Sequence, residues 1–269
     1  MLFKAVQYVD ALPAPVEDAL VEEEALQIGL NRLPYTMTMR TPGNDECLTA
    51  GLLFTEHVIG RESDILSYEE RPCEPEGHNS YADVVIPESL ARRQNLGNRT
   101  ILSSSSCGLC GKTDVSGMNF PQQPLDHNLR LDVLWLETMQ QLVSDRQALF
   151  QATGGCHAAA AFSIGGDLLT LMEDVGRHNA VDKVIGYLLI NGLLDRADLI
   201  SVSGRVSYEI VAKLHTARIP FLVSVSAPST LAVELCDKMG MTLISFCRGN
   251  KTTVYSHDES VIGAARCAG

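Results

Sequence analysis

Apolar residues follow two different spacings along the chain, and the change falls near Leu129. Before it, apolar and polar side chains alternate over Tyr35–Arg40, which predicts a half-buried strand, and the stretches 65–68 and 81–86 predict two more. A helix is predicted from Asn44 to about His57, directly after a proline and a glycine. The first part of the chain is therefore expected to form a smaller, strand-rich unit.

Beyond Leu129, predicted helices and strands alternate. The clearest helix begins near His178, because its apolar residues recur at the spacing of one helical face. The other predicted helices span 132–150, 207–217 and 230–239, and the predicted strands span 157–164, 167–172, 199–203, 221–226 and 241–247. The first two strands form a hairpin across Gly165 and Gly166. This alternation predicts an α/β fold with a parallel sheet and helices on its faces.

The loops that follow the last three predicted strands are suited to an anionic ligand. In an open α/β sheet, ligands bind beyond the carboxyl ends of the strands, where loops and helix N-termini meet. Gly204-Arg205, the segment 227–230 and the segment 248–251 occupy these positions, and each offers a small residue, a hydroxyl group or a positive charge. The pattern predicts a phosphorylated ligand. The alternative for any one of these residues is a solvated charge or a helix cap.

A charged segment, Glu173–Asn179, lies between the predicted hairpin and the clearest helix. Its position before a helix N-terminus is suited to orienting a ligand, but acidic residues also cap helices there. Cys156 and His157 precede it and remain ambiguous, because a single histidine is more often a hydrogen-bonded core residue.

Cys107 and Cys110 form a Cys-x-x-Cys pair among glycine and serine residues. Such a pair serves as a metal clip, a dithiol redox couple, a persulfide relay or a plain turn. A thioredoxin-type pair opens a long helix, whereas residues 112–117 are poor helix formers, which disfavours dithiol redox chemistry. Zinc needs four ligands, which Cys156 and His157 could complete, but the chain has no second closely spaced pair.

Composition narrows the class of protein further. The chain has 269 residues, of which 45% are hydrophobic, and a net charge of -12 argues against a broad nucleic-acid surface. No run of 18 apolar residues and no signal peptide is present, so we expect a cytoplasmic protein without membrane contact. Its eight cysteines are expected to be reduced, with Cys236 and Cys247 filling the core.

Several segments taken together resemble the FdhD family, the sulfur carriers needed for formate dehydrogenase activity. In chain order they are Cys107–Gly111, Thr153–Ala160, Glu173–Lys183, Ser203–Arg205 and Val225–Pro228. The match runs from about Thr41 to Lys251, and its most specific part is the segment 173–183. Cys47, His57 and Cys156 depart from the residues expected at their positions, so no role is carried over to them.

The resemblance implies a homodimer and a cytidine-deaminase-like α/β/α core with a smaller β-rich N-terminal domain. We expect the domains to span 1–125, which ends in the Cys-x-x-Cys loop, and 126–269, which binds the cofactor. The deaminase signatures His-x-Glu and Pro-Cys-x-x-Cys are absent, so deamination is not implied. The implied activity is sulfur transfer from a cysteine desulfurase to the molybdenum bis-guanine-dinucleotide cofactor before its insertion into formate dehydrogenase. GDP is the expected mimic of that cofactor.

The resemblance also assigns roles to residues. Cys107 is expected to carry a persulfide, and Cys110 to assist by relaying sulfur or by releasing it through a disulfide. Phe246 is expected to stack on a guanine or pterin face; alternatively it is a core residue before a hairpin turn into Thr252–Ser256. The expected cofactor-binding residues are Asp174, Arg177, His178, Gly204, Arg205, Ser226, Phe246, Cys247, Arg248, Gly249, Asn250 and Lys251. No resident metal is expected.

Overall fold

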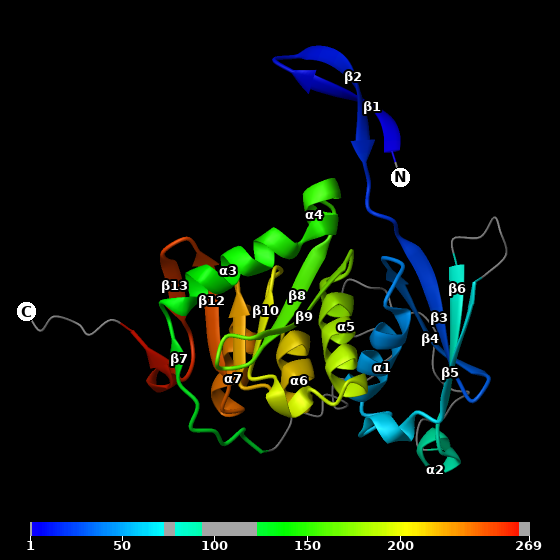
Figure 1. Cartoon of the computed structure of the whole chain (residues 1–269), viewed down its shortest axis with the longest axis vertical. Coiled ribbons are helices and arrows are strands. Elements are labelled where there is room, and N and C mark those ends of the chain that lie inside the picture. The colour runs from blue at the N-terminus through cyan, green and yellow to red at the C-terminus, as the bar shows by residue number, and fades with distance from the viewer. Residues whose placement is uncertain (1, 73–78, 93–122, 264–269) are drawn as a thin grey trace, which may run out of the picture.

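The computed structural model describes residues 2–72, 79–92 and 123–263. Its centre is a six-stranded mixed sheet in the order β13-β12-β11-β10-β8-β9 (Figure 1). The strands are β8 (His157–Phe162), β9 (Leu168–Asp174), β10 (Leu199–Val202), β11 (Phe221–Ser224), β12 (Thr242–Arg248) and β13 (Lys251–Val254). β10, β11 and β12 are parallel, whereas β8 is antiparallel to both β9 and β10. The predicted hairpin and the predicted parallel run are both confirmed.

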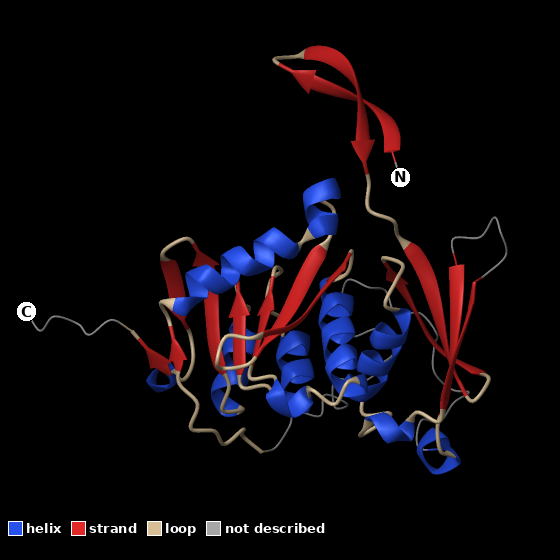
Figure 2. Ribbon diagram, viewed as in Figure 1, coloured by secondary structure: helices blue, strands red, loops and turns tan. Residues whose placement is uncertain are grey.

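Helices cover both faces of this sheet (Figure 2). The helices α5 (Arg177–Ile190), α6 (Tyr208–Thr216) and α7 (Thr230–Lys238) share one buried cluster with strand residues such as Ile200 and Leu222. Helix α3 (Trp135–Arg146) shares a second cluster with the alternate strand residues, including Leu199 and Phe221. Because side chains alternate across a strand, the two clusters lie on opposite faces. The expected α/β/α layering is confirmed.

A second sheet forms the smaller N-terminal unit, in the order β4-β3-β6-β5. Its strands are β3 (Glu24–Leu30), β4 (Leu33–Arg40), β5 (Ser67–Pro72) and β6 (Asn79–Val85). Helix α1 (Asp45–Thr55) joins this sheet to α5. Gly51 of α1 and Gly186 of α5 face each other where the helices cross, and a Cβ atom at either position would overlap the opposite backbone. The crossing therefore requires glycine on both helices.

The buried core and buried ion pairs run across both units without interruption. One hydrophobic cluster contains Leu26 of β3, Leu48 of α1 and Val184 of α5. The buried Lys183 ammonium lies 2.8 Å from Asp174 Oδ2 and donates to the Thr41 carbonyl oxygen, also at 2.8 Å. The expected domain boundary at residue 125 stays a prediction, while the described halves pack as one body around α1 and α5.

The N-terminal strands β1 (Leu2–Val9) and β2 (Leu12–Ala19) form a hairpin that projects from the body (Figure 1). The described residues also form the short helices α2 (Glu88–Ala91) and α4 (Ala148–Thr153) and the paired strands β7 (Leu131–Asp132) and β14 (Val261–Ile262). Among them are also the 3-10 turns η1 (Glu62–Asp64), η4 (Leu194–Arg196) and η5 (Asp258–Ser260). No helix within the described ranges is long and apolar enough to cross a membrane.

Several predicted elements have different bounds in the structure. The helix predicted over 132–150 is two helices that meet at Gln147, because the Glu173 carboxylate accepts the main-chain N–H groups of Leu149 and Phe150 and fixes α4 separately. The strand predicted over 221–226 ends at Ser224, whose hydroxyl accepts the Ser226 N–H and turns the chain. The strand predicted over 65–68 begins only at Ser67.

Candidate functional site

Five chain segments meet at one end of the central sheet, where the parallel strands β10, β11 and β12 reach their carboxyl ends; this end of the sheet is called the edge below. Because β8 runs opposite to its neighbours, its first residue, His157, pairs with the last residue of β9, Asp174. Ser203 follows β10 at the same edge, where its N–H donates to the Ala158 carbonyl oxygen at 3.0 Å. The Phe246 N–H donates to the Ser226 carbonyl oxygen, which brings the ends of β11 and β12 together. The edge therefore gathers most of the residues that the sequence assigns to the cofactor.

Arg177 and His157 converge over Gly204. A Cβ atom at Gly204 would lie 3.2 Å from Arg177 Cδ and 3.3 Å from His157 Cε1, so glycine provides the room for both side chains. Arg177 Nε is inaccessible to solvent and has no hydrogen-bond partner among the described residues. Arg205, the next residue, is exposed. The Arg177 guanidinium beside a glycine backbone is suited to an oxyanion, and the exposed Arg205 adds a positive charge to the same segment.

His157 is held in one orientation by Ser203. The Ser203 hydroxyl oxygen accepts the Ala158 N–H at 2.9 Å and lies 3.2 Å from His157 Nδ1. When the Ser203 hydroxyl donates to Nδ1, the ring proton of a neutral His157 is on Nε2. Burial lowers the pKa of His157, and the nearby Arg177 and His178 lower it further. The lowered pKa favours the neutral form of His157. The sequence assigned this residue no role, because a single histidine is more often a hydrogen-bonded core residue.

Asp174 and His178 lie below the edge, inside the protein. Asp174 is fully buried, and its carboxylate accepts the N–H groups of Thr41 and Gly176 in addition to its ion pair with Lys183. His178 Nε2 lies 3.0 Å from Glu209 Oε2, and both side chains are about nine-tenths buried. These contacts hold the segment before α5 against its neighbours, and the expectation that the two side chains face the ligand stays a prediction.

The segment Phe246–Lys251 is divided between two environments. Phe246 is 38% exposed, with a positive φ of 56°, and its ring centroid lies 6.4 Å from that of Tyr255. Arg248 is exposed and its Nε donates to the Val225 carbonyl oxygen at 3.0 Å, which leaves its terminal nitrogens available. Positive φ is rare for a bulky residue, so the irregular part of β12 between Ser245 and Arg248 presents this aromatic ring at a conformational cost. The alternative of a core phenylalanine is wrong, while the hairpin turn into the next strand is confirmed.

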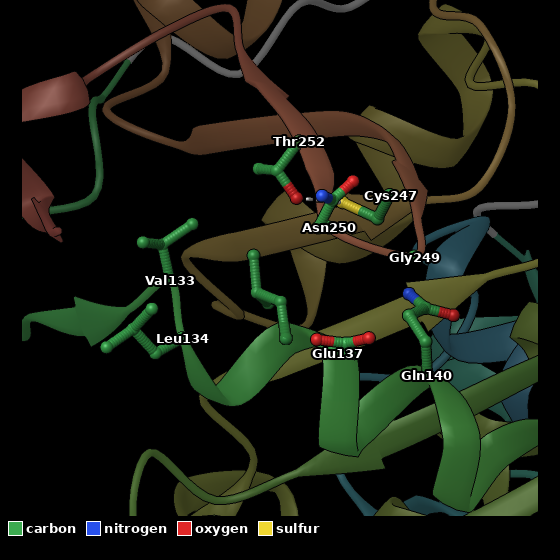
Figure 3. A pocket seen from close by; sticks show the side chains of 9 residues that line it. Val133, Leu134, Glu137, Gln140, Cys247, Gly249, Asn250 and Thr252 are labelled. Atoms are coloured by element: carbon green, nitrogen blue, oxygen red, sulfur yellow. Dashed lines mark hydrogen bonds between the residues drawn. The ribbon is translucent and has the colours of Figure 1, made fainter. Parts of the chain in front are cut away.

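Cys247 points the other way, toward α3, and lines a small cavity (Figure 3). The cavity has a volume of about 150 Å³, and its lining also includes Glu137 and Gln140 of α3 and Gly249 and Asn250 of the turn. Ligand pockets usually enclose at least about 300 Å³. The cavity is too small for a nucleotide, so Cys247 does not share the environment of Phe246 and Arg248.

Four cysteines lie within the described ranges, and all have weakly acidic thiols. Burial raises the pKa of Cys236 to about 12. Burial and the adjacent Glu173 carboxylate, which accepts the thiol proton at 3.3 Å, raise the pKa of Cys156 to about 12. Burial also raises the pKa values of Cys47 and Cys247. None of the four is suited to nucleophilic sulfur chemistry at neutral pH, because the thiolate is the reactive form.

The predicted sulfur-carrying pair, Cys107 and Cys110, lies outside the described residues, as do Cys73 and Cys267. Within the described ranges, no group of three or more His, Cys, Asp or Glu side chains is arranged to hold a metal ion. The zinc quartet considered from the sequence cannot be assembled from described residues alone, because two of its four members fall in the segment 93–122.

The fold and the edge define an α/β protein with cationic side chains near the carboxyl ends of its parallel strands. The chain belongs to the FdhD/NarQ family, whose model matches residues 21–262. A relative from Nocardia farcinica named "Sulfur carrier protein FdhD" is 42% identical over 89% of this chain and 87% of its own. One of the same name from Mycolicibacterium paratuberculosis is 40% identical over 91% and 92%.

A solved structure supports the fold. The crystal structure of a putative formate dehydrogenase accessory protein from Desulfotalea psychrophila superposes with a TM-score of 0.74 and covers 97% of this chain and 99% of that chain. Because the two sequences are 22% identical, this likeness bears on the fold alone.

Proposed function

We propose that this protein is a sulfur carrier for formate dehydrogenase maturation and that Cys107 carries the sulfur as a persulfide. In the loading step, the Cys107 thiolate attacks the terminal sulfur of a persulfide on a cysteine desulfurase. The donor's sulfur–sulfur bond breaks, the donor cysteine leaves as a thiolate, and Cys107 becomes the persulfide. The electrons balance within this exchange, so no further oxidant or reductant takes part.

The assignment of the persulfide to Cys107 rests on excluding the four cysteines that the structure describes. Cys47, Cys156, Cys236 and Cys247 have pKa values raised by burial and remain protonated at neutral pH. The carrier is therefore sought among the other four cysteines of the sequence. Of these, Cys107 and Cys110 form the one closely spaced pair, and Cys107 corresponds to the first cysteine of the motif shared with the FdhD family.

Cys110 is proposed to help release the sulfur from Cys107 by one of two routes. It accepts the sulfur as a persulfide of its own, or its thiolate attacks the Cys107 sulfur that is bonded to carbon. The second course expels hydrosulfide and leaves a Cys107–Cys110 disulfide, which a cellular dithiol must then reduce. The proposed acceptor is the molybdenum bis-guanine-dinucleotide cofactor, treated as a substrate.

The sheet edge is the proposed place for that substrate. Arg177 and Arg205 are placed for phosphate oxygens, His157 adds a neutral donor, and exposed Phe246 offers a stacking surface for a guanine. Arg248 and Lys251, both exposed, extend the positive charge along the turn after β12. Asp174 and His178 take a positioning role, because both side chains are engaged within the protein.

The proposed partners follow from the same assignment. A cysteine desulfurase supplies the sulfur, a formate dehydrogenase receives the modified cofactor, and the chain works as a cytoplasmic homodimer. The relatives' name, sulfur carrier protein FdhD, supports the sulfur-carrying part of this proposal.

Maturation in cells tests the proposal. Cells that lack their own carrier are supplied with this protein, its Cys107→Ala variant or its Cys47→Ala variant, and formate dehydrogenase activity is measured. We expect activity with the wild type and with Cys47→Ala, and none with Cys107→Ala. Full activity with Cys107→Ala would refute the persulfide assignment. More than about half an equivalent of bound zinc, with melting sensitive to a chelator, would support the zinc-binding alternative instead.

A further inference from the structure

The β1–β2 hairpin exposes apolar side chains on both of its faces. Every residue of β1 is exposed, and Val6, Tyr8 and Leu12 are 59%, 68% and 72% exposed. A two-stranded hairpin alone is at best marginally stable in water, and stability usually needs a third strand or a packed face. Within the described residues, β2 touches α4, whereas β1 is exposed along its whole length and the hairpin projects away from the body (Figure 1). It therefore needs a partner.

The two edges of the hairpin differ. Pro15 pairs with Val6 and Pro13 pairs with Tyr8. Because proline has no N–H, these are the positions without hydrogen bonds between the two strands, so the main-chain groups of Val6 and Tyr8 point outward. The outer edge of β2 lacks donors at both prolines and is blocked to further strands, whereas the outer edge of β1 is open.

One open edge and one blocked edge suit a two-fold pair. If two β1 strands pair antiparallel, the open edges are consumed, and both outer edges of the new sheet are the proline-bearing β2 strands. Assembly then ends at the dimer, because a closed isologous contact leaves no edge for a third chain.

The charge of β1 favours a second copy as its occupant. The chain carries a net charge of -12, which opposes contact between acidic surfaces of two copies. β1 contains one lysine and no acidic residue, and Lys4 lies opposite Glu17 of its own β2. In an antiparallel pairing centred on Val6, Lys4 falls opposite the partner's Tyr8, not opposite another lysine, which also allows a cation–π contact.

We propose that two copies of this chain associate through their β1 strands, antiparallel about a two-fold axis, in a four-stranded sheet of order β2-β1-β1-β2. The inference rests on the homodimer of the proposed function and adds the surface that forms it. It assigns the hairpin the role of a dimerisation arm.

Two proline variants test the arm. Val6→Pro removes an outward N–H from the open edge, and Glu17→Pro makes the same change on the edge that is already blocked. Sedimentation velocity over a range of concentrations gives the dimer dissociation constant of each. We expect a dimeric wild type, a dissociation constant raised roughly tenfold or more in Val6→Pro, and little change in Glu17→Pro, because proline deletes a ladder hydrogen bond only on the open edge. Melting temperatures should agree, because the arm lies outside the core.

Each of the other outcomes would contradict a different part of the proposal. A monomeric wild type contradicts both the homodimer and the arm. A wild type whose dimer survives Val6→Pro unchanged keeps the homodimer and refutes the arm. Loss of the dimer in both variants, or association beyond a dimer, contradicts the difference between the two edges.

Discussion

The His178–Glu209 pair gives the sharpest test of which residues at the edge serve the fold. His178→Ala removes a partner that lies 3.0 Å from Glu209 Oε2, and it leaves a carboxylate that is about nine-tenths buried. The other oxygen, Oε1, already has no hydrogen-bond partner among the described residues, so the carboxylate has no alternative there. Breaking a buried pair of this kind costs about 3 kcal/mol or more. For a chain of this size, this corresponds to a fall in melting temperature of roughly 6 °C.

A double-mutant cycle separates the pair from its surroundings. The free energy of unfolding is measured by urea denaturation, followed by circular dichroism, for the wild type, His178→Ala, Glu209→Gln and the double variant. A hydrogen bond to a charged group predicts a coupling of about 1.5–3 kcal/mol. His257 and Glu259 provide a matched control, because the same 3.0 Å contact is solvent-exposed there and should couple by less than about 1 kcal/mol.

The GDP affinity of the His178→Ala variant shows whether His178 positions neighbouring residues or contacts the ligand itself. Folded protein, kept well below its melting temperature, should bind GDP with nearly the affinity of the wild type. A coupling below about 0.5 kcal/mol, together with a loss of GDP affinity of tenfold or more, would show that His178 contacts the ligand and would refute this reasoning.

Three further predictions concern other parts of the molecule. Arg248→Ala should weaken GDP binding by about 1.5–3 kcal/mol in titration calorimetry, whereas Arg196→Ala, an exposed arginine before β10, should not; equal affinities for all three proteins would remove the turn after β12 from the site. Gly186→Ala should lower the free energy of unfolding by several kcal/mol in urea, because its methyl group overlaps the α1 backbone, and an unchanged midpoint would contradict the helix crossing. Because the pKa values of Cys156 and Cys236 are about 12, their iodoacetamide labelling in the folded protein should be negligible at pH 8 and should increase only as the pH approaches 12; rapid labelling at pH 8 would contradict their burial.

Local patterns predicted the parallel part of the fold well. The apolar face of α5, the hairpin across Gly165-Gly166 and the alternation after Leu199 each combine a strong period with a clear turn, so the sequence alone specifies them. The antiparallel β8 could not be deduced from its residues, since the direction of a strand depends on the connections around it. That direction is what brings His157 to the same edge as Ser203.

The N-terminal hairpin escaped prediction because it buries almost nothing. Pro13 and Pro15 argue against a strand, and exposure on both faces removes the alternation on which strand prediction depends. The opposite difficulty applies to Asp174 and His178: their sequence position beside a helix N-terminus is the same for a ligand-facing residue and for a buried one. In the structure, Asp174 contacts Thr41 and His178 contacts Glu209, which no local pattern in the sequence shows.

The central claim, that Cys107 carries sulfur, is tested most directly by intact-mass spectrometry. The protein is incubated with a cysteine desulfurase and cysteine, and its mass is measured before and after treatment with a reductant. We predict a gain of one sulfur atom that the reductant removes, its location on Cys107 by peptide mapping, and no gain in Cys107→Ala. A wild type that gains no sulfur, or a Cys107→Ala variant that loads as fully as the wild type, would contradict the account.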